Sequence, residues 1–222
     1  MLRAALFDFG GVILSSPFEA FARYEQANSL PEGFIRQLNA TNPDDNAWAK
    51  LERSEVDLAG FAELFEAEAR AAGHEVDGRA VIGLLGGEVR PRMVEALRRC
   101  KARLSTAMLT NNFVTGARPE SPEGDPTGRS AQIAEIMELF DVIVESSQIG
   151  VRKPDPRFYE IACEQLGIEP HEAVFLDDLG VNLKPARAMG MTTIKVEDPD
   201  DAIAELEQVV GFALRDRPAR RD

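Results

Sequence analysis

The chain has 222 residues, 44% of them hydrophobic and 28% charged, and its formal net charge is −13. This length is enough for one large hydrophobic core, or for a core domain with a smaller appendage. An acidic surface repels the phosphates of nucleic acids and anionic lipids, so we expect neither a nucleic acid nor a membrane as partner. The two cysteines lack the spacing of a metal site or a disulfide framework, which favours a cytoplasmic protein.

Short apolar segments rich in Val, Ile, Leu and Phe recur along the chain, at residues 4–9, 104–109, 141–145, 173–176 and 192–196. Apolar runs without strict alternation are typical of strands buried on both faces of a parallel sheet. Helical patterns alternate with them, at residues 91–103, 130–139, 156–166, 183–189 and 199–210. Several of these helices begin at proline and end before glycine, which is ordinary helix punctuation. The alternation predicts an α/β fold with a doubly wound, parallel, Rossmann-like sheet.

The alternation is interrupted between the first and second predicted strands. This stretch is filled instead by helical patterns, at residues 18–28, 32–39 and 58–72. The chain should therefore divide into three parts: a core domain of residues 1–15 and 90–214, an inserted helical cap of residues 16–89, and a flexible tail of residues 215–222. Trp48 either lines the cleft beneath the cap or packs inside it. Residues 116–128 are rich in proline, glycine and acidic side chains, which predicts a mobile loop.

Polar side chains gather at one edge of the predicted sheet, where ligands bind beyond the C-terminal ends of parallel strands. They are Asp8 after the first strand, Thr110 and Asn111 after the second, Lys153 after the third, and Asp177 and Asp178 after the fourth. Three converging carboxylates repel one another unless a cation lies among them. Oxygen ligands of this kind suit Mg²⁺, so the sequence predicts a magnesium site beside a lysine.

Four motifs in this order resemble those of the haloacid dehalogenase superfamily of hydrolases: DFGGVI at 8–13, LTNN at 109–112, VRKPDP at 151–156 and FLDDLGVN at 175–182. The resemblance covers the whole chain, including a helical cap after the first motif. Within the superfamily, the chain is most similar to the phosphatase-like N-terminal domain of soluble epoxide hydrolases and to the related domain of acyl-CoA dehydrogenase family member ten. The stretches that carry this closer resemblance are FDVIVES, KPDPRFY, CEQLG, FLDDLGVNLK and TIKVEDP.

The resemblance implies roles in phosphoryl transfer for four residues. Asp8 matches the family nucleophile, whose carboxylate attacks phosphorus and forms an aspartyl-phosphate. Thr110 and the backbone N–H of Asn111 match groups that bind the phosphoryl oxygens. Lys153 matches the lysine that neutralises the charge of the nucleophile and of the phosphoryl group.

The resemblance also implies how the metal is held. Asp8 and Asp178 match acidic metal ligands, and the backbone carbonyl of Gly10 matches a further ligand. Asp177 is either an alternative ligand or a neighbour that orients one. Asn182 takes a position where many relatives have a carboxylate, and we expect it to act in substrate binding, orienting the lysine or a metal-bound water.

Gly10 is also where the chain departs from the family pattern. Most phosphatases of the superfamily have a second aspartate here, two residues after the nucleophile, and it acts as general acid and base. Such help is worth about a hundred- to ten-thousand-fold in rate, so a water or a cap side chain would have to replace it. We predict a Mg²⁺-dependent phosphatase of a small phosphorylated metabolite. The alternatives are a 2-haloacid dehalogenase-type hydrolase, which needs no metal, and a catalytically weak phospho-ligand-binding domain.

Overall fold

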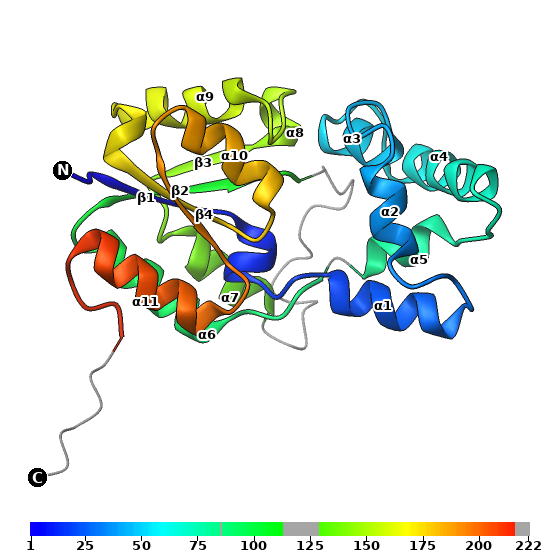
Figure 1. The fold of residues 1–222 in the computed structure, drawn as a ribbon, viewed down its shortest axis with the longest axis horizontal. Helices are drawn as coiled ribbons and strands as arrows, with labels where there is room; N and C mark the ends of the chain where they lie inside the picture. Colours follow the sequence, from blue (N-terminus) through cyan, green and yellow to red (C-terminus); the bar gives the residue numbers. More distant parts are fainter. Residues whose placement is uncertain (85, 113–128, 216–222) are drawn as a thin grey trace, which may run out of the picture.

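A computed structural model of the chain describes residues 1–84, 86–112 and 129–215, except for the side chain of Glu19. Its centre is a five-stranded sheet in which every pair of neighbouring strands is parallel, with the order β3-β2-β1-β4-β5 (Figure 1). The strands are β1 (Ala4–Phe7), β2 (Ser105–Thr110), β3 (Val142–Glu145), β4 (Ala173–Asp177) and β5 (Thr192–Lys195). The predicted parallel α/β sheet is thus confirmed, with strand ends shifted by one or two residues.

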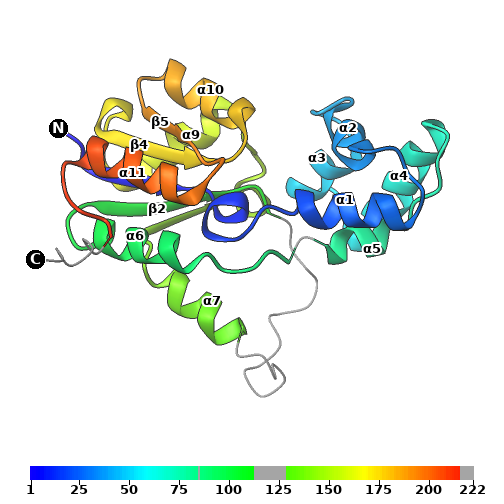
Figure 2. The ribbon, with the colours of Figure 1, turned by 60° about the horizontal axis from the view of Figure 1, so that its bottom comes forward.

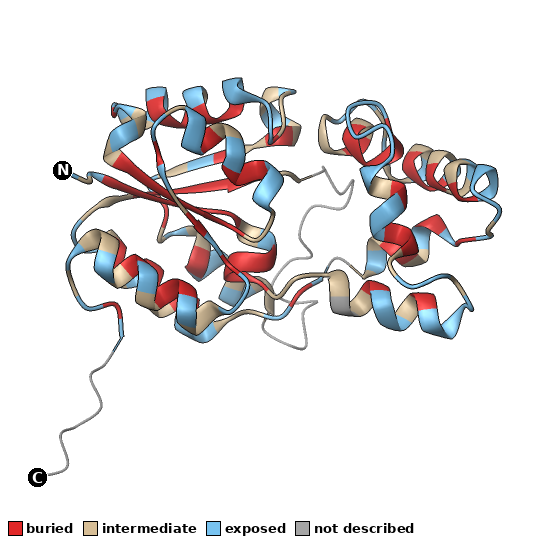
Figure 3. Ribbon diagram, in the orientation of Figure 1, coloured by how far each residue is buried: buried red, intermediate tan, exposed pale blue. Residues whose placement is uncertain are grey.

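Helices cover both faces of the sheet (Figures 1 and 2). One face carries α6 (Pro91–Lys101), α7 (Arg129–Met137) and α11 (Pro199–Val210), and the other carries α8 (Ser146–Ile149), α9 (Pro156–Leu166) and α10 (Gly180–Ala188). A short turn, η3 (Pro170–Glu172), precedes β4. Along β1, Ala5 and Phe7 pack into the core on the first face, whereas Ala4 and Leu6 pack into the core on the second. Burial on both faces explains the unbroken apolar runs of the sequence, and Figure 3 shows it in the central strands.

Capping residues account for the helix ends that the sequence predicted well. At the start of α9, the Asp155 side chain accepts a hydrogen bond from the backbone N–H of Arg157, and the helix ends at Gly167, which has a φ of 63°. By contrast, α10 begins at Gly180, three residues before the predicted start at Leu183. No side-chain cap marks that start, so periodicity alone placed it too late.

Among the described residues, five α-helices between β1 and α6 pack around an apolar core of their own: α1 (Phe18–Ala27), α2 (Phe34–Ala40), α3 (Ala47–Glu52), α4 (Leu58–Ala71) and α5 (Gly78–Gly83). We call them the cap. The sequence pattern missed α3 and α5, which at six residues each are too short to show a helical period. Trp48 of α3 is only 7% exposed and packs against the rings of Phe61 and Phe65, so it belongs to the core of the cap.

The chain enters and leaves the cap through two segments that lie side by side. Leu14 and Val89 form an antiparallel bridge, and the backbone N–H of Ser15 donates to the Glu88 carbonyl at 2.7 Å. The expected domain junctions near residues 15 and 90 lie in these paired segments, and the division itself remains a proposal. Residues 116–128 and 216–222, for which a loop and a tail were predicted, lie outside the described residues. Within the described residues, no helix has both the length and the apolar character needed to span a membrane.

Candidate active site

The site lies where β1 and β4 run side by side in the middle of the sheet. From β1 the chain passes to β2 and β3 on one side, and it returns to β4 and β5 on the other. Such a reversal of strand order opens a crevice at the C-terminal ends of the strands, which is where open α/β sheets bind ligands. Asp8 follows β1 directly, and Asp177 is the last residue of β4.

Asp8 is held by hydrogen bonds to both of its carboxylate oxygens. Its Oδ1 accepts from the backbone N–H of Phe9 at 2.7 Å, at the start of the turn η1 (Phe9–Ile13). Its Oδ2 lies 3.0 Å from the ammonium of Lys153. The side chain of Asp8 remains partly accessible at 11% exposure, so one face of the carboxylate can meet a ligand.

Lys153 is almost completely buried, and its ammonium lies between two carboxylates. Nζ is 2.7 Å from Oδ2 of Asp177 and 3.0 Å from Oδ2 of Asp8. Burial alone lowers the pKa of this amine, but attraction by Asp177 and Asp8 outweighs it and raises the pKa of Lys153 above its usual value. The lysine therefore stays charged at neutral pH.

The main chain of Lys153 is fixed by the side chain of Asn111. The amide of Asn111 donates to the Lys153 carbonyl at 3.0 Å, and its oxygen accepts from the Lys153 N–H at 2.8 Å. The sequence had assigned only the backbone N–H of Asn111 to phosphate binding and had missed this clamp. Thr110, at the C-terminal end of β2, is 8% exposed at the same edge.

Both carboxylate oxygens of Asp177 accept hydrogen bonds from other groups of the protein. Oδ1 accepts from the backbone N–H of Leu179 at 2.8 Å and from the amide of Asn182 at 3.0 Å, and Oδ2 accepts from Lys153. Asn182 is itself 4% exposed, and its carbonyl accepts a hydrogen bond from the hydroxyl of Tyr159 at 2.6 Å. The amide of Asn182 thus contacts Asp177, which in turn accepts a hydrogen bond from Lys153.

Asp178 lies against the backbone of Gly11. A Cβ at Gly11 would be 2.2 Å from Oδ2 of Asp178, and the φ of Gly11 is +77°, so only glycine fits this position. The hydroxyl of Ser16 donates to the same Oδ2 at 3.2 Å. Ser16 belongs to the segment that enters the cap, and no sequence signal linked it to the site. On the returning segment, Arg90 donates to the carbonyl of Gly11 at 2.6 Å.

The carboxylates of Asp8, Asp177 and Asp178 form a compact acidic cluster. Each offers one oxygen, and these oxygens lie within 4.8 Å of one another. Burial raises the pKa of Asp8 well above its usual range, Lys153 opposes that shift, and the two other carboxylates reinforce it. Burial, followed by repulsion from Asp177, also raises the pKa of Asp178. A hard divalent cation would relieve this repulsion, and the all-oxygen donor set fits Mg²⁺.

Gly10 is exposed, and a Cβ built there would meet nothing within 4 Å. Its φ of −71° and ψ of 134° are open to any residue. The space and the backbone conformation at Gly10 would therefore accommodate an aspartate.

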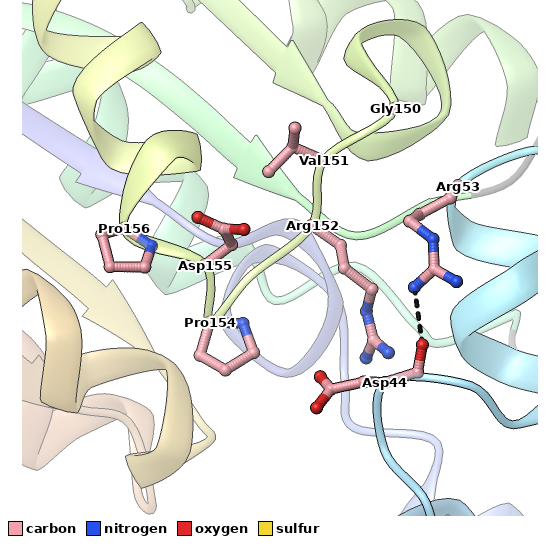
Figure 4. Close-up of a pocket in the computed structure, with 8 residues that line it drawn as sticks. All are labelled: Asp44, Arg53, Gly150, Val151, Arg152, Pro154, Asp155 and Pro156. Atoms are coloured by element: carbon pink, nitrogen blue, oxygen red, sulfur yellow. Dashed lines mark hydrogen bonds between the residues drawn. The ribbon is translucent and has the colours of Figure 1, made fainter.

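A separate pocket of about 430 Å³ lies between the cap and the core (Figure 4). Asp44 and Arg53 line it from the cap, and residues 150–152 and 154–156 line it from the core. Figure 4 shows the Arg152 side chain extending from this loop toward the cap segment that carries Asp44. Asp8, Asp177 and Asp178 are not among the residues that line this pocket.

Comparisons with known proteins show the family to which the chain belongs. The family model of haloacid dehalogenase-like hydrolases matches residues 2–190. Bifunctional epoxide hydrolase 2 of Sus scrofa is 33% identical over 98% of this chain and 40% of its own length. Acyl-CoA dehydrogenase family member 10 of Mus musculus is 35% identical over 99% of this chain and 20% of its own length. The chain thus spans less than half of either relative. Sesquiterpene phosphatase astK of Aspergillus oryzae is 28% identical, over 94% of this chain and 97% of its own.

Solved structures show the same fold. A HAD-like hydrolase of Porphyromonas gingivalis has a TM-score of 0.66 and 21% identity, covering 98% of this chain and 100% of its own. A HAD family enzyme of Bacteroides thetaiotaomicron, in complex with magnesium and inorganic phosphate, has a TM-score of 0.58 and 17% identity, covering 89% and 97%. The epoxide hydrolase and the acyl-CoA dehydrogenase family member are the two kinds of relative that the sequence motifs predicted. With its family match over residues 2–190, the chain belongs to the haloacid dehalogenase-like hydrolases.

Proposed function

We propose that the protein is a cytoplasmic, Mg²⁺-dependent phosphatase that forms an aspartyl-phosphate on Asp8 and acts on a small phosphorylated metabolite. The observation that carries this proposal is the placement of Asp8, with a charged lysine 3.0 Å from one oxygen and two further carboxylates beside it. The phosphatase similarity over nearly the whole chain supports the choice of phosphate esters over other substrates.

In the first step, a carboxylate oxygen of Asp8 bonds to phosphorus as the bond from phosphorus to the leaving oxygen breaks. The leaving group departs with that electron pair and takes up a proton. In the second step, water attacks phosphorus, the bond to Asp8 breaks, and inorganic phosphate is released with the carboxylate restored. Lys153, whose ammonium lies 3.0 Å from Asp8, would neutralise the negative charge that develops on the reacting oxygens.

Asp8, Asp178 and the backbone carbonyl of Gly10 would hold the metal, with Asp177 at their side. When bound, Mg²⁺ supplies positive charge to the phosphoryl oxygens and to the acidic cluster. Asp177 already has hydrogen bonds from Lys153, Leu179 and Asn182, so we assign it to positioning the lysine. Thr110 and the backbone N–H of Asn111 would bind the phosphoryl oxygens from the β2 side.

Because position 10 is a glycine, no aspartate at this position can donate a proton to the leaving group. We therefore propose that the favoured substrates carry leaving groups that are stable as anions, such as acyl or aryl phosphates, or that a water protonates the leaving oxygen. An alkyl monoester, whose leaving oxygen is strongly basic, should react much more slowly.

The test is phosphate release from acyl, aryl, sugar and lipid phosphates, with and without Mg²⁺. We expect turnover that a chelator abolishes and that Asp8→Asn removes. Tight binding of beryllium fluoride with Mg²⁺ to the wild type, without turnover of any ester, would instead support a phospho-ligand-binding domain. Halide release from 2-haloacids that a chelator leaves unchanged would instead support a dehalogenase.

A further inference from the structure

Arg152 is a core residue whose side chain is held by the cap. Its Nε lies 2.7 Å from Oε2 of Glu52, at the end of α3, and its Nη1 donates to the carbonyl of Pro43 at 2.8 Å. Both charged side chains are largely buried, with exposures of 22% for Arg152 and 16% for Glu52. Nearby, the hydroxyl of Ser54 donates to the carbonyl of Ser147 at 3.3 Å. The end of α3 is thus docked on α8 and on the loop that follows it.

This docking lies next to the catalytic lysine along the chain. Arg152 directly precedes Lys153, whose main chain is clamped by Asn111 and whose ammonium contacts Asp8. The loop therefore has little freedom to follow the cap if the cap moves. A shift of α3 must either keep the contact between Arg152 and Glu52 or break it.

A buried ion pair stabilises the docked state little, but the docked state requires that both of its partners be charged. The attraction between the two charges roughly balances the cost of removing both from water, so an intact pair adds little net stability. If one partner loses its charge, the other remains in the interface without compensation, and the docked state becomes unfavourable. Burial, opposed by Arg152 and Lys153, raises the pKa of Glu52, which is the shift expected for a desolvated carboxyl group.

We propose that Glu52 and Arg152 are positioning residues that keep α3 docked on the loop that precedes Lys153, and that substrates with a bulky leaving group depend on this docking more than minimal phosphoryl donors do. The leaving group lies on the side of phosphorus away from Asp8, and a bulky one needs the cap in place to be oriented. A donor as small as acetyl phosphate is held mainly by the core residues around its phosphoryl group. The kinetic part of this inference rests on the proposed phosphatase function, whereas the position of the cap does not.

The position of the cap is tested by small-angle scattering of the full chain. The variants are Glu52→Gln, Arg152→Gln and the double variant, and the matched control is Glu55→Gln, which removes an ion pair made within the cap by a carboxylate that is 48% exposed. We expect both single variants to show a larger radius of gyration than the wild type, the double variant to be no larger than the singles, and the control to be unchanged. Unchanged scattering by Glu52→Gln and Arg152→Gln, in protein that thermal unfolding shows to be folded, would overturn the inference.

The selectivity is tested with acetyl phosphate and p-nitrophenyl phosphate. Each single variant should lower kcat/KM for p-nitrophenyl phosphate at least tenfold more than for acetyl phosphate, because fewer molecules have the cap docked. The double variant should lose no more than the worse single variant, since the two residues act as one unit. Equal losses on both substrates, or a loss confined to Glu52→Gln, would refute the positioning role. If the wild type turns over neither compound but the scattering changes as expected, the phosphatase proposal fails and the docking role stands.

Discussion

Replacing Gly10 by aspartate would place a carboxyl group two residues after Asp8, where it could serve as a proton donor. The backbone there has a φ of −71° and a ψ of 134°, and nothing lies within 4 Å of the position of a new Cβ. The substitution therefore introduces neither strain nor a clash. The new carboxyl group would extend from the turn that follows Asp8, two residues from the nucleophile, where the superfamily carries its general acid.

The expected gain can be weighed against its cost. General acid catalysis is worth about a hundred- to ten-thousand-fold in rate, or about 3 to 5 kcal/mol of barrier. The opposing term is repulsion between the new carboxylate and the buried acidic cluster. Because Gly10 is exposed, that repulsion is screened by water and costs about 1 kcal/mol at most. We therefore expect a net rate increase of at least about tenfold for alkyl phosphates, whose leaving oxygen needs the proton.

The assay compares kcat for a sugar phosphate and for p-nitrophenyl phosphate, both at saturating Mg²⁺. Gly10→Asp should accelerate the sugar phosphate and leave p-nitrophenyl phosphate, whose leaving group is stable as an anion, nearly unchanged. Gly10→Asn is the matched control, since it has the same size and no acidic proton. The reasoning is refuted if Gly10→Asp folds and binds Mg²⁺ without accelerating the sugar phosphate, or if Gly10→Asn gives the same gain.

Three further predictions concern the supports of the site and a buried thiol. Ser16→Ala removes the hydrogen bond to Asp178, so calorimetry should find the Mg²⁺ affinity lowered by about tenfold, whereas Ser16→Thr should keep the wild-type affinity. Equal affinity in the wild type and both variants would contradict this. Asn182→Ala takes a charge-assisted hydrogen bond from buried Asp177, so urea unfolding should report a loss of about 1.5 to 3 kcal/mol, and a loss below about 0.5 kcal/mol would be a failure. Burial raises the pKa of Cys100 to about 12, so iodoacetamide at pH 8 should label it only after unfolding; rapid labelling of the folded chain would disprove this.

The sequence predicted those features that depend on local pattern. Apolar runs placed the strands, and the C-terminal ends of the strands brought Asp8, Lys153 and the paired aspartates to one edge of the sheet. This worked for Asp8 and the paired aspartates because parallel strands have a single ligand-binding edge, so a residue at the end of a strand has few other places to lie. Lys153 lies beyond α8 and reaches the same edge on the loop that Asn111 holds.

The sequence failed where a contact joins segments that are far apart along the chain. The hydrogen bond from Ser16 to Asp178 spans 162 positions, and neither residue carries a local sign of the other. The clamp of Asn111 on Lys153 was missed for the same reason. Glu52 ends a six-residue helix that periodicity does not detect, so its pairing with Arg152 appeared only in three dimensions.

The paired segments at Leu14 and Val89 have a consequence for how such proteins diversify. Because Leu14 and Val89 are paired, the chain leaves the sheet and returns to it at neighbouring points, and the two ends of the intervening cap are already joined. A different insertion could be accommodated here without moving any strand. One contact that limits this freedom is the hydrogen bond from Ser16, on the segment that enters the cap, to Asp178, whereas Arg90 and Gly11 lie outside the cap and would keep their hydrogen bond. A different insertion that kept a hydroxyl at position 16 would also keep the hydrogen bond to Asp178.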